Sequence, residues 1–197
     1  ASLAWHTSDH NSTDGPSWWC GFDDIGNGNP GYLDAWVQYL DTPSFTVPDG
    51  GSMTADMWWG IEDPAGASVP GTCTDGWDQA NVQISIDNGN TWIVIEGSTP
   101  YDFECGYGTV YNGYEGAPEW GGDADWHTVN FDLSSYSGQD AQLRFAFYSD
   151  PAYSTIDNAG ITGFQVDNIV VSNGTFSDTG DDPDALAVSG EVWVDQF

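Results

Sequence analysis

The sequence has a single strongly basic residue, Arg144, and no lysine, against 31 acidic residues, so its formal net charge is −30 over 197 residues. Nucleic-acid binding needs Lys and Arg to displace counterions from phosphates, so the composition argues against it. An anionic membrane surface would repel the chain for the same reason. Because salt bridges are almost unavailable, the carboxylates must face water, bind inorganic cations or accept hydrogen bonds. We therefore expect a protein of brine, seawater or the calcium-rich outside of a cell.

The sequence also lacks long apolar runs and has few cysteines. No stretch of 18 apolar residues is present, so no membrane insertion is predicted. The odd number of cysteines permits one disulfide bond and a spare thiol at Cys20, an intermolecular bond, or three free thiols. Cys73 and Cys105 flank the best hairpin pattern, which favours their pairing. Sequons at Asn11 and Asn173 permit N-glycosylation, so we expect an extracellular or cell-surface protein.

Apolar residues recur mainly at every second position, which is the periodicity of β-strands. The clearest case is a hairpin, in which a polar Asp87–Asn90 turn containing Gly joins two β-branched runs. No ten-residue segment has a helical period. The predicted fold is therefore an all-β, antiparallel β-sandwich, and we expect a jelly roll. The strands are expected at 17–22, 34–40, 45–47, 53–59, 82–86, 92–95, 126–133, 141–148 and 164–171.

Two long segments, 61–79 and 97–125, are rich in Gly, Pro, Asp and aromatic residues, and loops of this length are usually functional or packed on themselves. Their aromatic side chains could stack on sugar rings, although in a sandwich such residues more often belong to the core. The candidates for this sugar platform are the loop tyrosines together with Trp58, Trp59, Trp77 and Trp120.

The C-terminal segment changes character. Residues 1–176 form the predicted jelly-roll domain, 177–184 read as an acidic linker, and 185–197 carry the pattern of a detached β-strand. A final strand that folds back onto its own sheet is one interpretation. Donation of the strand to a neighbouring molecule is the other. The apolar residues of this donor-type strand are Leu186, Val188, Val192, Trp193, Val194 and Phe197.

Several segments, in this order and spacing, resemble secreted jelly-roll modules of bacteria and archaea. These modules accompany M6-type metallopeptidases, occur as cleaved-adhesin repeats and are similar to MAM domains. The resemblance covers roughly residues 5–172 and implies a non-catalytic sandwich that binds structural Ca²⁺ and serves adhesion, substrate binding or protease support. The segments are 17–21, 76–78, 82–92, 129–138, 143–145, 149–150 and 163–169.

The chain departs from these modules at its start. Such modules usually open with a strand that carries a Phe and then an acidic residue shortly before a Trp, and this chain begins too late for it. The segment Gly190–Phe197 has that pattern at the opposite end. A sandwich that lacks one strand exposes an unpaired edge and an apolar groove, which the tail could fill in its own molecule or in the next.

Aspartate makes up 25 of the 31 acidic residues, and its short carboxylate suits a hard cation such as Ca²⁺. Asp167 is the leading candidate ligand, because the resembling modules place a calcium-binding acid in their last body strand. The further candidates follow or precede predicted strands, and each has an alternative interpretation as a solvated turn residue: Asp23, Asp24, Asp78 and Asp150.

These observations predict a non-enzymatic, Ca²⁺-stabilised extracellular subunit. The first hypothesis is that copies assemble head to tail into a surface filament, as each tail strand inserts into a neighbouring sandwich. The alternative is a glycan- or protein-binding accessory module of a secreted hydrolase, with the tail folded back in cis. No catalytic constellation is predicted: the sequence contains no arrangement that supports nucleophilic catalysis, and Cys20 has no basic neighbour to activate it.

Overall fold

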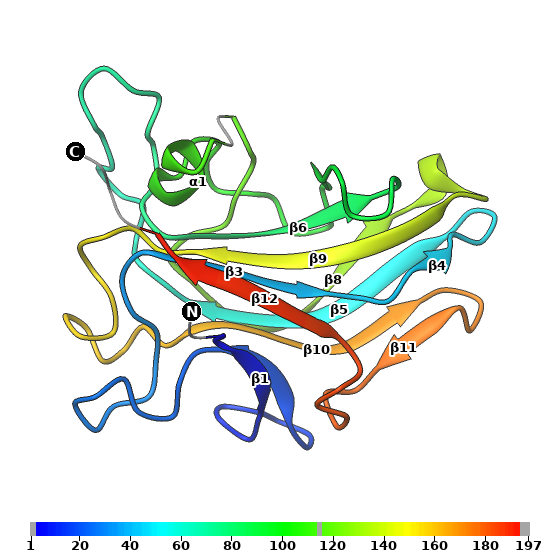
Figure 1. The fold of residues 1–197 in the computed structure, drawn as a ribbon, viewed down its shortest axis with the longest axis horizontal. Helices are drawn as coiled ribbons and strands as arrows, with labels where there is room; N and C mark the ends of the chain where they lie inside the picture. Colours follow the sequence, from blue (N-terminus) through cyan, green and yellow to red (C-terminus); the bar gives the residue numbers. More distant parts are fainter. Residues whose placement is uncertain (1–2, 114–115, 194–197) are drawn as a thin grey trace.

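The computed structural model describes residues 3–113 and 116–193, which form two antiparallel β-sheets packed face to face (Figure 1). The first sheet has the order β1-β2-β10-β5-β8, and β11 pairs with β10. The second has the order β12-β3-β9-β6-β7, and β4 pairs with β9. The predicted antiparallel sandwich is confirmed, whereas its finer description as a jelly roll stays a prediction. The strands are β1 (Trp5–Ser8), β2 (Ser17–Cys20), β3 (Trp36–Asp41), β4 (Phe45–Thr46), β5 (Ser52–Gly60), β6 (Gln79–Ser85), β7 (Ile93–Val94), β8 (Asp123–Asp132), β9 (Asp140–Tyr148), β10 (Gly163–Val171), β11 (Phe176–Asp178) and β12 (Ala187–Val192).

Helical structure is confined to two short elements, α1 (Tyr107–Tyr111) and a single 3₁₀ turn at Ser134–Tyr136, within the part of the chain described. Neither reaches ten residues, in agreement with the missing helical period. Among the described residues, no helix is long and apolar enough to cross a bilayer.

The core lies between the two sheets and follows the predicted alternation. In β5, the inward positions Met53, Ala55 and Met57 are fully buried, while the residues between them are partly exposed. The facing strand β9 contributes Leu143 and Phe145 to the same core. Each such side chain contributes roughly 1.5–3 kcal/mol to folding when it leaves water. The sandwich is therefore held together by apolar and aromatic packing and needs few ion pairs.

The predicted hairpin is present as β6 and β7. Its turn is organised by Asp87, whose Oδ1 accepts hydrogen bonds from Ser85 Oγ at 2.9 Å and from the Thr91 backbone N–H at 2.8 Å. Asn88 and Gly89 adopt φ values of 61° and 82°, a left-handed conformation that Asn and Gly tolerate best. The turn residues therefore explain where the chain reverses.

Two strands were not predicted. Strand β1 has only four residues and one fully apolar side chain, Trp5, so its sequence carries no alternation to detect. Strand β11 occupies the start of the segment predicted as an acidic linker. There Asp178 is buried and accepts hydrogen bonds from Trp18 Nε1 at 2.8 Å and from Gly180 N at 3.0 Å. The linker therefore begins later than predicted, because one of its acids is a structural hydrogen-bond acceptor.

The tail strand β12 pairs with β3 of the same chain, from Ala187 opposite Asp41 to Val192 opposite Trp36 (red in Figure 1). The tail therefore lies in cis as an edge strand of the second sheet, and in this structure it is not detached. Leu186 belongs to the main core and Val188 packs against it.

The two ends of the tail differ from the predicted pattern. Val192 was expected to face the core but is 51% exposed. The neighbouring Trp193 is buried instead, and its Nε1 donates to the Ser149 carbonyl at 3.2 Å. The candidates Val194 and Phe197 lie outside the described residues.

We predict that Leu186→Ala lowers the free energy of unfolding by about 2 kcal/mol or more, because it leaves a cavity under the tail strand. Val192→Ala, six residues along the same strand, is the matched control and should change it by less than about 0.5 kcal/mol. Urea denaturation monitored by tryptophan fluorescence measures both. Equal effects would show that the tail does not pack as described.

Candidate metal centre

Two long loops meet above one end of the second sheet, near α1 (Figure 1). The predicted disulfide bond joins them, because Cys73 lies in the first loop and Cys105 in the second. Beside it, Asp75 Oδ1 accepts a hydrogen bond from the Cys105 N–H at 2.7 Å. The third cysteine, Cys20, is buried and free. The disulfide is consistent with a protein that matures in an oxidising compartment.

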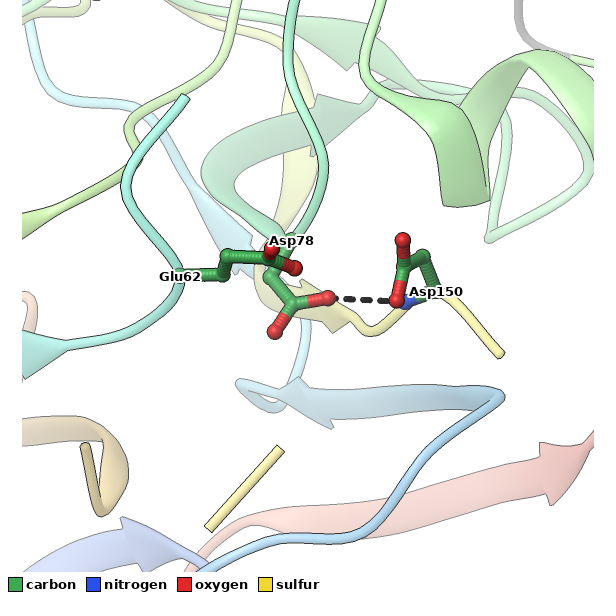
Figure 2. Close-up of side chains that lie close together, drawn as sticks. All are labelled: Glu62, Asp78 and Asp150. Atoms are coloured by element: carbon green, nitrogen blue, oxygen red, sulfur yellow. Dashed lines mark hydrogen bonds between the residues drawn. The ribbon is translucent and has the colours of Figure 1, made fainter. Parts of the chain in front are cut away.

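An acidic triad forms where β5 and β9 end and β6 begins. Glu62 follows β5, Asp78 directly precedes β6 and Asp150 follows β9, so the sheets bring together residues that are far apart in sequence. One carboxylate oxygen from each lies within 4.8 Å of the others (Figure 2). Asp78 and Asp150 were predicted ligands. Glu62 was missed, because it stands in a loop and no alternation or turn pattern marks it.

Hydrogen bonds fix two members of the triad. Asp78 is fully buried and accepts hydrogen bonds from the Tyr32 hydroxyl and, at 2.7 Å, from the Asp150 backbone N–H. Asp150 Oδ1 in turn accepts from the backbone N–H groups of Ala152 at 3.0 Å and Tyr153 at 3.3 Å. These donors orient the carboxylates, but they are neutral and leave the negative charge uncompensated.

The third member has no such donor. Glu62 Oε2 is buried and has no hydrogen-bond partner among the described residues. The same is true of Oδ1 of Asp34, whose charge acts on Glu62. A buried carboxylate oxygen without a partner costs free energy unless it is protonated or meets a cation.

The electrostatics agree with this geometry. Burial first, and then the charges of Asp150, Asp157, Asp34 and Asp63, raises the pKa of Glu62 to about 8. Burial and the charge of Asp150 hold the pKa of Asp78 well above its usual range, and burial also raises the pKa of Asp150.

Arg144 cannot relieve this charge. Its guanidinium donates to both carboxylate oxygens of Asp41, each at 2.8 Å, and packs over the rings of Tyr39 and Trp92. The triad must therefore retain protons or bind an external cation. Carboxylate oxygens are the ligands that Ca²⁺ prefers, and three of them plus backbone carbonyls and water make a reasonable donor set. The residues thus fit the predicted ion.

The other predicted ligands lie elsewhere. Asp167 is buried in β10 beside a β-bulge, and burial raises its pKa to about 6, with smaller contributions from Asp56, Asp178 and Asp181. Among the described residues, only the triad brings three ligand atoms together, so Asp167 is not part of such a group. Asp23 and Asp24 lie in an exposed loop after β2, where Asp24 Oδ1 accepts from Gly26 N and Gly28 N, each at 2.8 Å. Asp24 therefore acts as a turn cap.

Part of the proposed sugar platform is core. Trp59 and Trp120 are buried and stacked, with ring centroids 4.9 Å apart and an interplanar angle of 16°. Tyr101 packs on Trp120 with a centroid distance of 4.5 Å. The platform interpretation is wrong for the two stacked tryptophans, because the long loops use aromatic residues to bury themselves.

The two sequons differ in environment. Asn11 Nδ2 donates to Gln165 Oε1 at 3.0 Å, so its amide is already engaged. Asn173 is exposed, at the turn between β10 and β11. Both asparagines are exposed, and glycosylation stays a prediction at both.

A scan against protein-family models gives no match for this chain, and a search of curated proteins finds no similar sequence. The site must therefore be interpreted from its own geometry.

We predict that Ca²⁺ raises the melting temperature and that EDTA lowers it, because an ion that binds only the folded state stabilises it by about 2.7 kcal/mol at 100 times its Kd. The effect should grow from pH 5 to pH 8. The raised pKa values mean that the folded, metal-free protein holds protons that the unfolded chain releases above about pH 4.5. Metal-free stability should therefore fall as the pH rises to about 8, while Ca²⁺ binding, which displaces those protons, strengthens.

In the variant Glu62→Gln, most of the rise in melting temperature that Ca²⁺ causes should disappear. Without metal, the stability of this variant should fall much less as the pH rises to 8. Asp63→Asn is the control, because it changes an adjacent acid outside the triad and should retain the response. Differential scanning fluorimetry measures the melting temperatures of the unchanged protein and of both variants, with Ca²⁺ and with EDTA. An unchanged melting temperature in EDTA at pH 8 would rule out the metal centre.

Proposed function

We propose that this chain is a non-enzymatic extracellular structural subunit, stabilised by Ca²⁺ at the triad, whose copies join head to tail when the tail strand β12 of one molecule pairs with β3 of the next. A filament built in this way needs a terminal strand that can leave its own sheet and an edge that accepts an identical strand. The observation that carries the proposal is the placement of β12 as the last strand of the described chain and the edge of its sheet.

The contacts of β12 support an exchange. Its described ladder partner is β3 alone, and Leu186 and Trp193 anchor its two ends. Between these anchors, Ala187, Ser189 and Glu191 are exposed. A second copy of the strand would meet the same register and the same two sockets, so cis and trans pairing make equivalent contacts. Their balance then depends on the connecting segment and on protein concentration.

The connection to the body is long enough for either arrangement. Residues 179–186 join β11 to β12, and eight residues span at most roughly 26–29 Å when extended. Removal of β12 would expose the N–H and C=O groups of β3 and the sockets of its anchors. Such an edge readily pairs with another strand, because unpaired edges and apolar grooves are unfavourable in water.

A structural role also fits the chemistry of the side chains. Burial raises the pKa of the Cys20 thiol well above its usual value, so this thiol is protonated at neutral pH and is a poor nucleophile. The acidic composition and the disulfide bond favour an extracellular, salt-rich setting. We expect that setting to supply the divalent cation for the triad.

A second candidate function is an accessory binding module that remains monomeric. The cis pairing of β12 favours it, because a sheet completed by its own tail has no vacancy for a partner. The two candidates differ in one measurable property, namely which molecule supplies the strand beside β3.

Cysteine trapping tests this directly. Tyr39 and Ser189 are cross-strand partners of β3 and β12, and such partners lie within the range that a disulfide bridges. One preparation carries Tyr39→Cys and another carries Ser189→Cys, and the two are mixed at high concentration with Ca²⁺ under mild oxidation. Strand exchange predicts disulfide-linked heterodimers of these two variants on a non-reducing gel. The double variant should form a ladder.

The matched control is the pair Thr54→Cys and Asn130→Cys, which are cross-strand partners of β5 and the edge strand β8, and β8 lies in the middle of the chain rather than in its tail. This pair should close only within one molecule, and its two single variants should not cross-link when mixed. If the tail pair behaves in the same way at every concentration, strand exchange is wrong and the monomeric module is supported.

A further inference from the structure

A pocket separate from the acidic triad lies on the outer face of the second sheet, away from the core. Its floor is formed by Asn81 and Gln83 of β6 with Tyr148 of β9, and Thr109 of α1 closes one side. Its volume is about 290 Å³, at the small end of the range for ligand sites. The remaining described lining residues form its rim: Trp92, Ile93, Val94, Gly116, Ala117 and Pro118.

The pocket is notable for its charge. None of its described lining residues is acidic or basic, although the protein carries 31 acids. Each of four other surface pockets has at least one acidic residue in its lining. Glu119, behind Thr109, adds little charge, because burial raises its pKa to about 8. The Arg144 guanidinium lies over Trp92 at the rim, but Asp41 already pairs with it, so a charged ligand would find no unpaired counter-charge among the described lining residues. An anion would also meet the net charge of the whole molecule.

The floor of the pocket consists of buried polar side chains. Asn81 is fully buried, Gln83 is 6% exposed and Tyr148 is 1% exposed. Gln83 Nε2 donates to Asn81 Oδ1 at 2.9 Å and lies 3.4 Å from the Tyr148 hydroxyl. Gln83 Oε1 accepts no hydrogen bond from the described residues, so it remains available as an acceptor. Amide and hydroxyl groups so placed match a ligand that both donates and accepts hydrogen bonds.

The rim adds apolar surface. Trp92 is held in place, because the Arg144 guanidinium lies 3.8 Å from its ring centroid and its Nε1 donates to the Gly89 carbonyl at 3.2 Å. Val94 pairs directly with Gln83, so its apolar side chain lies on the same face of the sheet as the floor. An immobilised indole beside polar groups provides contact area at a low cost in conformational entropy.

We propose that this pocket binds one ring of a neutral saccharide, whose C–H face packs against Trp92 and Val94 while its hydroxyl groups hydrogen-bond with Gln83 Oε1 and the Tyr148 hydroxyl. The Asn81 amide already donates to the Pro118 carbonyl at 3.3 Å and accepts from Gln83 Nε2, so a purely apolar ligand would leave Gln83 Oε1 without a partner. A cation would bind the carboxylate-lined pockets instead, and an anion is repelled. A neutral polyol with an apolar face satisfies both the floor and the rim.

The test is ligand-observed saturation-transfer NMR, followed by calorimetric titration, on the intact chain. The neutral probes are D-glucose, D-galactose, D-mannose and N-acetyl-D-glucosamine, with D-glucuronic acid and N-acetyl-neuraminic acid as charged probes and N-acetyl-alaninamide as a peptide-like one. We expect at least one neutral sugar to bind with a Kd of about 1 mM or lower. The acidic sugars should bind at least about tenfold more weakly.

Gln83→Leu keeps the size of the side chain and removes its hydrogen bonds, so it should weaken binding at least about fivefold. Trp92→Ala should weaken it further. Trp126→Ala changes a partly exposed tryptophan of β8 in the first sheet, outside this pocket, and should leave affinity unchanged. Near-native melting temperatures of the variants confirm that folding is retained. For Gln83→Leu, which keeps all 11 tryptophans, an overlay of Trp fluorescence spectra provides a second check.

The proposal is overturned if no neutral sugar binds at about 10 mM, ten times the expected Kd. It is also overturned if the acidic sugars or the peptide-like probe bind as tightly, or if Gln83→Leu and Trp92→Ala bind like the unchanged protein. These outcomes do not depend on β12, so they are independent of the strand-exchange result.

Discussion

The scarcity of positive charge determines how this protein manages its carboxylates. One guanidinium serves 31 acids, and Asp41 already occupies it. The remaining acids solve the problem in other ways. Asp87 and Asp24 accept backbone hydrogen bonds at turns, while Asp178 accepts an indole N–H inside the sandwich. Among the described residues, the triad is the one place where three carboxylate oxygens gather with neutral hydrogen-bond donors alone, so its charge must be relieved by protons or by an external cation.

The fold was largely predictable, because the sandwich follows from alternation. Strand β5 and the first half of β9 bury every second residue, and that pattern is visible in the sequence. Strand β1 was missed because four residues carry too little pattern. The start of the linker was predicted too early, because a sequence does not distinguish a buried aspartate from an exposed one. Asp178 is recognised as buried only through its hydrogen bond with the Trp18 indole.

The candidate site was half predictable. Asp78 and Asp150 stand at strand ends, where turn residues and metal ligands are both expected, so sequence reasoning could find them. Glu62 meets them only because the end of β5 lies close to the start of β6, although the two strands belong to different sheets. The favoured Asp167 rested on a resemblance. Its position in β10 separates it from the triad, and no local pattern reveals such a separation.

The disulfide between Cys73 and Cys105 has a consequence for maturation. It ties the loop that leads into Asp78 to the loop that leads into α1 and so into Thr109. The first loop leads directly into β6, and the second leads into α1, which lies over the same sheet. A single covalent bond therefore limits the conformational freedom of both loops. A newly made chain in a reducing environment would hold both regions loosely. Oxidation of the two cysteines would then act as a checkpoint in maturation, because it orders the loop that carries the triad residue Asp78 and the segment that carries Thr109 in one step.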